Sequence, residues 1–497
     1  MTRPPLGTVV VVAALGGLTL VGSLLGRPAA SRVRTSQVEV VGATAVCPDL
    51  RQVKGILASR VSVGAAPLPA GRGGATRGKV EIVSNSARTA PSPLAVSEPG
   101  QVAVGVGTGI DQDALVVSAA GPLAAGLEAE QVTRGEGGRE RGLAGLRCEP
   151  PRREAWFEGG STVVGDESVL VLANVDDTPA TVDVSVFSAT GPADPRPGQG
   201  ITVEPHSRRV ILMDTIAPDR ALLAVHVLSR QGRVAAALRH SRTDGSSPLG
   251  VDWVPQAAPP AAQVVVPGIP QGGNGQRYIL ITNPTTDDTV ASVRITTQDG
   301  QYVPTGLDQV AVPAGTTVTA RLDIETLHSA LAATVTTDGV PVLAGGLVRD
   351  AQQGSKTREF AYTGASIPLS GPALMTDLVI NRPTESTLIL SAPQGKATVV
   401  VTPIQVLGQQ GRLPAAKTVV VPAGRTAVLK LSTFYPPGTD AQLAVEVRPL
   451  EGSGPVYAAR YLRERGAHGP LTTLLDLQGP AQLVPRLPAV LDQQAAD

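Results

Sequence analysis

The chain has 497 residues and balances 42 basic against 42 acidic side chains. This balance excludes a broad electrostatic attraction to nucleic acid or anionic lipid, and the length exceeds what a single hydrophobic core supports. Charged residues make up only 17% of the chain and aromatic residues 2%, whereas 55 glycines and 43 prolines recur throughout. The composition favours several domains of short strands joined by turns over long helices.

The first predicted element is an apolar segment at residues 6–26, which carries no charged side chain. A helix of this length spans the ~30 Å hydrocarbon core of a bilayer at ~1.5 Å per residue. A signal peptide needs small residues before its cleavage site, and here Arg27 and Pro28 follow the segment. We therefore expect a transmembrane signal anchor, with a cleaved signal peptide as the alternative.

The charges that flank this segment and the composition of the chain indicate opposite orientations. Arg27, Arg32 and Arg34 follow the segment and only Arg3 precedes it, so the positive-inside rule places the C-terminal bulk in the cytoplasm. The composition and the cysteine usage are typical of exported proteins and favour the other side. We expect a single-pass protein of the cell membrane whose C-terminal bulk is extracytoplasmic.

Residues 36–150 are predicted to form an irregular N-terminal β-domain that contains both cysteines. No aromatic residue precedes Trp156, so the core of this domain is small and benefits from a cross-link. We expect Cys47 and Cys148 to form a disulfide outside the cytoplasm. The alternatives are free thiols, a catalytic thiol or a zinc site. The last two are disfavoured because no histidine precedes His206 and no C-x-x-C pair occurs.

The rest of the chain contains an internal repeat of 109 residues. The segments VEPHSRRVILM, VPAGTTVTARL and VPAGRTAVLKL begin at Val203, Val312 and Val421. Polar and apolar residues alternate within each copy, which is typical of strands with one buried face. The repeat predicts three tandem immunoglobulin-like β-sandwiches, at residues 153–261, 262–370 and 371–479, followed by a flexible tail at 480–497.

Two turn motifs predict hairpins within these copies, at Gln231-Gly232 and at Asp338-Gly339. The first hairpin would place His226 and His240 on opposite faces, where they could not share a metal ion.

Other polar and aromatic residues give weaker hypotheses. Trp156 occupies a strand position and is expected to pack in a core, with a sugar-stacking platform as the alternative. Exposure of Trp156, Trp253 and Tyr278 on one face would favour that alternative. The acidic pairs Asp176-Asp177 and Asp287-Asp288 are expected to form turns, with calcium binding as the alternative. No catalytic motif is present, and the sequence predicts no catalytic, cofactor-binding or metal-binding residue.

Several segments together carry a family resemblance, among them CPDL at Cys47, RGLAGLRCEPPRREAWFEGGST, LANVDDTPATVDV and GVDWVPQAAPPAAQVVVPGIP. With the N-terminal anchor, they resemble an actinobacterial family of secreted or membrane-anchored proteins of unknown function. The resemblance covers most of the chain and supplies no catalytic residues.

The expectation from the sequence is therefore a non-enzymatic, membrane-tethered scaffold or binding protein of the cell envelope. Its sandwiches would form a rod, and its partner would be an envelope protein or polysaccharide rather than nucleic acid. Binding is expected at the exposed loops 191–200 and 268–276. The alternative is a carbohydrate-binding accessory protein in envelope polysaccharide assembly.

Overall fold

The computed structural model shows a mainly β chain, so the prediction of the fold class is confirmed at this level. The described residues are 36–48, 57–67, 78–86, 96–106, 113–271, 275–322, 328–351, 358–380, 384–435, 441–479 and 483–486. The anchor expected at 6–26 and most of the tail lie outside them. Within the described ranges, no helix is long and apolar enough to cross a membrane.

The chain divides into two compact units. One contains residues 1–39 and 483–497, and its described part is an antiparallel pair formed by β1 (Ser36–Glu39) and β35 (Leu483–Arg486). The other unit contains residues 40–482. All further description concerns this larger unit, whose described residues form four two-sheet modules.

The first two modules consist of the following elements. The first module contains β2 (Gly42–Cys47), β3 (Leu57–Ala65), β4 (Lys79–Ser84), β5 (Val102–Val106), β6 (Leu115–Ala120), η1 (Gly121–Gly126), β7 (Leu127–Gly135), η2 (Gly138–Glu140) and β8 (Gly142–Arg147). The second contains β9 (Glu154–Glu158), β10 (Asp166–Asn174), β11 (Ala180–Phe187), η3 (Arg196–Gly198), β12 (Ile201–Val203), β13 (Ser207–Leu212), η4 (Met213–Thr215), β14 (Ala224–Gln231), β15 (Ala235–Asp244), β16 (Ser247–Val254) and β17 (Gln256–Ala257).

The last two modules follow without a long linker. The third contains β18 (Gln263–Ile269), β19 (Gln276–Thr282), β20 (Thr289–Thr296), β21 (Gln301–Tyr302), β22 (Val310–Val312), β23 (Thr317–Leu322), β24 (Leu331–Thr337), β25 (Leu343–Ala351) and β26 (Arg358–Gly364). The fourth contains β27 (Ala373–Ile380), β28 (Thr384–Ala392), β29 (Ala397–Gln405), β30 (Lys417–Val421), β31 (Arg425–Lys430), η6 (Leu431–Phe434), β32 (Ala441–Pro449), β33 (Tyr457–Gly466) and β34 (Gly469–Leu477).

All four modules share one sheet order. The inner sheets run β5-β3-β7-β8, β13-β10-β15-β16, β23-β19-β25-β26 and β31-β28-β33-β34. The outer sheet of the first module runs β2-β6-β4. The equivalent strands of the other modules follow the same order, as β9-β14-β11, β18-β24-β20 and β27-β32-β29. The repeat landmarks Val203, Val312 and Val421 end the equivalent strands β12, β22 and β30. Strand β11 shows the physical basis, because its residues alternate strictly between buried and half-buried positions.

The first module is a fourth copy of the same sheet arrangement, whereas the sequence indicated only an irregular β-domain. The offset of 109 residues relates Cys47 to Trp156 and Cys148 to Ala257, and Trp156 and Ala257 face each other across the β9–β17 ladder. The core of the first module is built from alanine, valine, leucine, isoleucine and cysteine, with no aromatic residue.

Both predicted hairpins are wrong. Strands β14 and β15, which flank Gln231-Gly232, belong to different sheets, and so do β24 and β25, which flank Asp338-Gly339. These turns carry the chain from the outer to the inner sheet of a module. The last two strands of each inner sheet instead form an antiparallel hairpin: β7–β8, β15–β16, β25–β26 and β33–β34.

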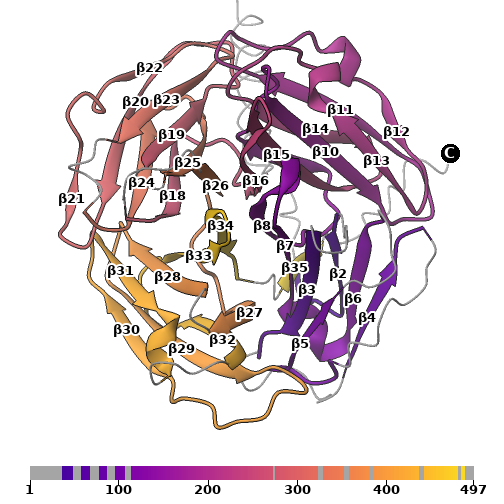
Figure 1. Ribbon diagram of the computed structural model, residues 1–497, viewed down its shortest axis with the longest axis vertical. Coiled ribbons are helices and arrows are strands. Elements are labelled where there is room, and N and C mark those ends of the chain that lie inside the picture. Colours follow the sequence, from indigo (N-terminus) through magenta and orange to yellow (C-terminus); the bar gives the residue numbers. More distant parts are fainter. Residues whose placement is uncertain are drawn as a thin grey trace, which may run out of the picture. The chain divides into compact units, whose positions relative to one another are not determined.

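The four modules do not form the expected rod. Strand β8 contacts β16, β16 contacts β26, β26 contacts β34, and β34 contacts β8, so the innermost strands close a cycle (Figure 1). The backbones approach closely here, since a Cβ on Gly142 of β8 would lie 2.7 Å from the backbone nitrogen of Val251 in β16. Glycine at such positions allows the backbones of neighbouring sheets to come into contact, because it has no side chain.

A second set of contacts joins each module to the next at the sheet edges. The backbone amides of Thr317 and Thr426 donate to the carbonyls of Ser188 and Thr297, at 3.0 and 2.9 Å. Between the first two modules, the side-chain Nδ2 of Asn85 donates to the Ser207 carbonyl at 3.1 Å. Leu407 donates to Val102 at 2.8 Å. This last bond joins the fourth module to the first and completes the cycle without a chain connection.

Candidate functional site

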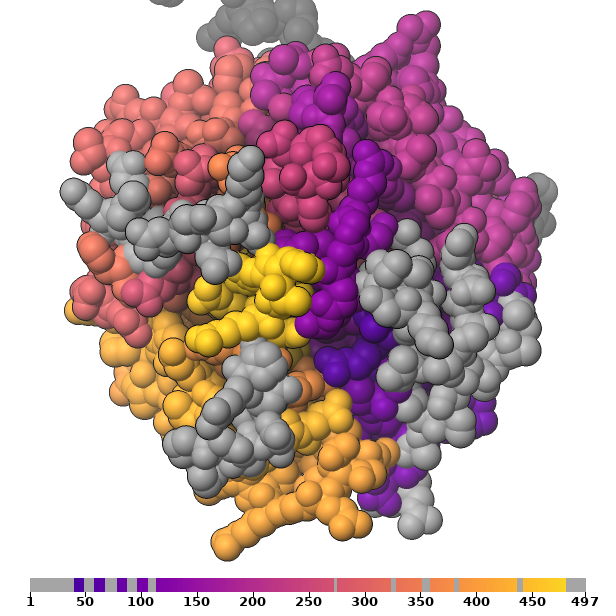
Figure 2. Space-filling model, in the orientation of Figure 1, coloured from indigo at the N-terminus to yellow at the C-terminus, as the bar shows by residue number. Residues whose placement is uncertain are grey.

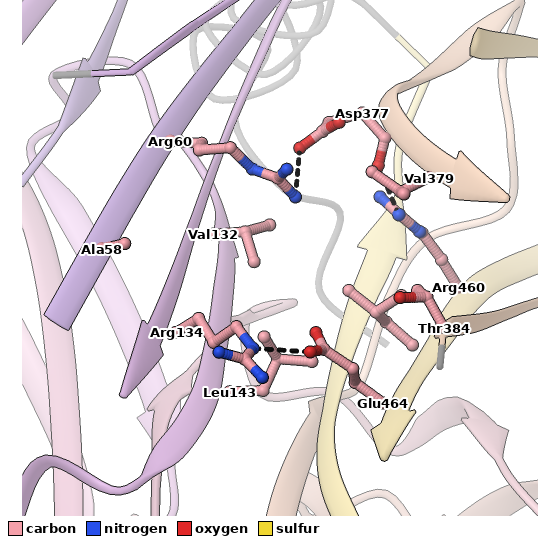
Figure 3. Close-up of a pocket in the computed structure, with 11 residues that line it drawn as sticks. Ala58, Arg60, Val132, Arg134, Leu143, Asp377, Val379, Thr384, Arg460 and Glu464 are labelled. Atoms are coloured by element: carbon pink, nitrogen blue, oxygen red, sulfur yellow. Dashed lines mark hydrogen bonds and ion pairs between the residues drawn. The ribbon is translucent and has the colours of Figure 1, made fainter. Parts of the chain in front are cut away.

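The first and fourth modules enclose a cavity of about 250 Å³. Strands β3 and β7 supply one wall, and β27, β28 and β33 supply the other (Figure 3). Two ion pairs cross from wall to wall. Arg60 lies 3.0 Å from Asp377, and Arg134 lies 2.5 Å from Glu464. Both arginines remain about one-third exposed, so their outer faces are open to solvent.

A buried arginine fixes the floor of this cavity. The Arg460 guanidinium donates to Ser386 Oγ at 2.9 Å, to Glu130 Oε2 at 3.3 Å and to the carbonyl of Asp377. Glu130 also accepts from the Thr376 amide at 3.2 Å. Burial raises the pKa of Glu130, and the charge of Arg460 partly offsets that effect. The floor is therefore a satisfied network that joins the two modules.

A second cavity, of about 330 Å³, lies between the third and fourth modules. Its base is formed by Arg277, which donates to Asp350 Oδ1 at 2.8 Å, and by Tyr461, which donates to Asp350 Oδ2 at 3.0 Å. Its walls include Val428 and Arg463. Residues of β33 thus line both cavities, with Arg460 and Glu464 in the first and Tyr461 and Arg463 in the second. The alternation of side chains along a strand accounts for this division.

A smaller cavity of about 140 Å³ lies in the second module beside Asp166. Arg242 donates to Asp166 at 2.8 Å, and His240 Nε2 lies 3.8 Å from the same carboxylate. Burial opposes ionisation, but His240 and Arg242 outweigh it and lower the pKa of Asp166 to about 2. Burial lowers the pKa of His240, which also hydrogen-bonds Tyr362 of the third module at 2.8 Å. This group joins two modules rather than forming a nucleophile–base pair.

All three cavities lie at one end of the inner sheets. Their lining residues come from the starts of β3, β10, β19 and β28 and from the ends of β7, β15, β25 and β33. The turns of the four inner-sheet hairpins are at the same end, which we call the turn end. In Figure 2 the yellow β33–β34 hairpin and the purple β7–β8 segment lie side by side in the middle of the face shown.

Two adjacent residues of the first module tie the four turns together. Glu140 forms an ion pair with Arg239 of the second module. Arg141 donates to the carbonyl of Arg358 in the third module at 3.2 Å and to those of His468 and Pro470 in the fourth at 3.2 and 3.1 Å. The turn end is therefore a joint product of all four modules.

A buried carboxylate forms a second junction along the inner strands. Asp252 of β16 accepts from the Tyr362 amide at 3.0 Å and from Thr473 Oγ1 at 2.8 Å. Thr473 Oγ1 in turn accepts from the Gly145 amide at 3.0 Å. Burial raises the pKa of Asp252 well above its usual range, and these hydrogen bonds only partly oppose the effect.

Because several carboxyl groups are buried, we predict that the free energy of unfolding decreases as pH rises. Burial raises the pKa of Glu128 to about 7, from 4.5, against the opposing effect of Arg147. Burial also raises the pKa of Glu158 well above its usual range. Thr282 is the one hydrogen-bond donor to Glu158 in the described chain, at 2.9 Å. The folded state then holds more protons than the unfolded state above pH 4.5, so the free energy of unfolding decreases from there through about pH 7.

Glu158→Gln tests this trend by removing one of these groups. Urea unfolding should show the variant more stable than the parent by at least about 1 kcal/mol at pH 8, with a smaller difference at pH 5. Glu167→Gln, at an exposed position in β10, is the matched control and should change neither value. A pH-independent difference between the Glu158 variant and the parent would contradict the prediction.

The structure contains the disulfide expected from the sequence. Cys47 and Cys148 are bonded, with their Cα atoms 4.6 Å apart, and both lie in the core of the first module. They occupy the place where Val265 and Ser366 form a bridge in the third module, at the repeat offset. The cross-link therefore closes the first strand of the module against the segment after its last strand.

The aromatic residues and histidines considered in the sequence analysis pack against other side chains of the fold. Trp156 and Trp253 are buried, and Tyr278 is half-buried, so they present no exposed stacking face. Trp156 stacks on His226 with ring centroids 3.8 Å apart. His226 and His240 lie in strands of different sheets.

The acidic pairs lie in turns that follow an asparagine, whose side chain forms hydrogen bonds to the backbone. The Asn174 and Asn283 side chains donate to the carbonyls of Val203 and Val312, at 3.0 and 3.1 Å. Asp176 pairs with Arg233. Across the described ranges, no group of three histidine, cysteine or acidic residues is arranged to hold a metal ion.

Of the two loops expected to bind a partner, residues 191–200 are fully described and 268–276 only in part. Pro192 packs beside Gly315 of the third module, so part of the first loop is used between modules.

The chain belongs to a family of unknown function, DUF5719, which it matches over residues 103–432. The match extends from β5 of the first module into η6 of the fourth. No curated protein and no solved structure matches the chain.

Proposed function

We propose that this protein is a non-enzymatic binding scaffold of the cell envelope, tethered by the segment at 6–26, with its modules outside the cytoplasm. One observation carries the proposal. Four modules close into a cycle whose turn end gathers three cavities lined by polar residues. Concave sites between rigid domains are where proteins commonly bind small ligands. The Cys47–Cys148 disulfide supports an oxidising compartment.

We further infer that the modules are immunoglobulin-like sandwiches. Two antiparallel sheets per module, with connections that cross between the sheets, support this class. Sandwiches of this kind commonly bind partners through the loops at one end of their sheets.

The alternative, a carbohydrate-binding protein in envelope polysaccharide assembly, draws support from the second cavity. Its volume of about 330 Å³ falls at the lower end of the usual range for small-ligand sites. Tyr461 and Asp350 place a phenol ring and a carboxylate at its base, and Thr387 and Ser329 add hydroxyl groups. Such groups suit the hydroxyl groups of a sugar.

A cavity-filling variant tests the proposal. The full chain, purified in detergent, should retain solubilised envelope glycans or proteins that can be identified by mass spectrometry after crosslinking. Val428→Trp places a bulky ring in the second cavity and should lower retention at least about tenfold, because the ligand is sterically excluded. Val420→Trp, at an exposed position of β30, is the matched control.

One outcome would exclude the second cavity, and another would contradict the non-enzymatic assignment. Equal retention by the parent and Val428→Trp would exclude the second cavity as the site. Turnover of any retained glycan or peptide by the purified chain would contradict the non-enzymatic assignment.

A further inference from the structure

The four hairpin turns at the turn end carry an excess of positive charge in a chain that is neutral as a whole. Ten arginines and six acidic side chains occupy the described residues of the four hairpin turns, at 134–141, 239–247, 349–351 with 358–359, and 460–470. The balance of 42 basic and 42 acidic residues along the chain therefore conceals a local excess. The excess is at the end where the cavities open.

Most carboxylates of these turns are already paired with arginine. Glu140 pairs with Arg239, Asp350 with Arg277, and Glu359 with Arg141, while Glu136 and Glu464 both pair with Arg134. Only Asp244 lacks a described ion pair. The turns therefore hold almost no spare negative charge for their other arginines.

Five arginines form no ion pair with any described residue, and we call them the arginine collar: Arg139, Arg349, Arg358, Arg463 and Arg465. All except Arg349 are exposed. Arg349 is half-buried and lies over the Tyr278 ring at 5.4 Å, and its Nε is buried without an acceptor. Burial and the nearby Arg242 lower the pKa of Arg349. An anion beside the guanidinium group of Arg349 would offset the repulsion between the two guanidinium groups.

We propose that the arginine collar binds an acidic polysaccharide, one that carries carboxylate groups along its chain. The collar has members from the turns of the first, third and fourth modules, which suits a ligand with repeated charges better than a single small anion. A guanidinium offers two parallel donors to a carboxylate, which favours this anion geometrically. This inference rests on the proposed binding function and specifies its ligand class.

Two observations favour an acidic glycan over nucleic acid. Single-stranded nucleic acids usually stack on exposed aromatic side chains. All twelve aromatic residues are described, and the only exposed one is Tyr302, in β21 of an outer sheet. The disulfide in the first module also favours a compartment outside the cytoplasm.

Charge reversal in the collar tests the inference. The full chain in detergent should bind fluorescent polygalacturonate at low salt, more tightly than neutral dextran. Arg463→Glu with Arg465→Glu should weaken binding at least about tenfold and reduce its salt dependence. Arg294→Glu with Arg412→Glu, a pair of exposed residues outside the turns, is the matched control and should stay within about twofold of the parent. Equal weakening by both pairs would overturn the collar as the site.

Further arms of the same titration distinguish the possible ligands. A single-stranded DNA oligonucleotide and vesicles of phosphatidylcholine with phosphatidylglycerol carry similar charge in other chemical forms. Tighter binding of either one than of polygalacturonate would overturn the assignment to acidic glycans. Absence of polygalacturonate binding, with envelope ligands still retained in a manner sensitive to Val428→Trp, would overturn this inference and leave the proposed function standing. Loss of both would overturn both.

Discussion

Replacing Cys148 with serine should lower the free energy of unfolding of the first module by about 4 kcal/mol. The two cysteines are 101 residues apart, so the bond removes a large loop-closure entropy from the unfolded state. The core of the first module contains no aromatic residue and includes both cysteines, so the loss of the bond acts directly on this core. Urea unfolding, followed by hydrogen exchange of individual segments, measures the effect.

The loss of stability should affect the first module before it affects the others. Amides of β2, β4 and β6 should exchange faster in the Cys148→Ser variant, followed by those at the seam where Leu407 meets Val102. Cys47→Ser with Cys148→Ser should equal the single change, since both remove one bond. Exchange that increases equally in β19 and β20 of the third module would contradict a local role for the disulfide.

The sequence could predict the repeated strands because their signal is local. Alternating residues around Val293 and Val399 lie in strands with one face buried in the core, and the 109-residue offset places the landmark valines in equivalent strands. The disulfide was also predictable, because a chain with two cysteines offers a single pairing. Each of these inferences needs only nearby residues or a simple count.

The closed cycle was not predictable from such patterns. Its contacts join residues far apart in the sequence, as Arg134 with Glu464 and Glu130 with Arg460, each 330 positions apart. No local periodicity records such a pairing. The two turns read as hairpins show the same limit, because a Gly-containing turn bends the chain equally well within a sheet or between two sheets.

The candidate site was missed for a related reason. Net charge, taken over the whole chain, suggested no electrostatic partner, while the arginines of the collar are scattered in sequence between Arg139 and Arg465. Only the fold brings the four turns together. A regional count of arginines near the turns TRGEGGRER, LRHSRTDG and YLRERGAHG would have shown the excess, although not that these turns share one end.

Replacing Arg141 with methionine should destabilise the closed cycle by about 4 kcal/mol. Its side chain is 4% exposed and lies 3.7 Å from the carboxylate of Glu359, which is fully buried. The variant removes the three carbonyl contacts that join the first module to the third and fourth, and it leaves Glu359 without its cation. Arg139→Met, at an exposed position two residues away, should cost less than about 0.5 kcal/mol.

The pH dependence of this effect separates the lost ion pair from the lost packing. Burial already raises the pKa of Glu359 well above its usual range, and Arg141 is the cation that opposes this shift. Without Arg141 the folded state holds that proton to still higher pH, so the deficit relative to the parent should grow as pH rises. Adding Glu359→Gln to Arg141→Met should remove most of this growth but should not restore the carbonyl contacts. Urea unfolding midpoints at pH 6 and 8 measure both parts. If the Arg141 and Arg139 variants unfolded alike, Arg141 would not be the residue that holds the turns of the four modules together.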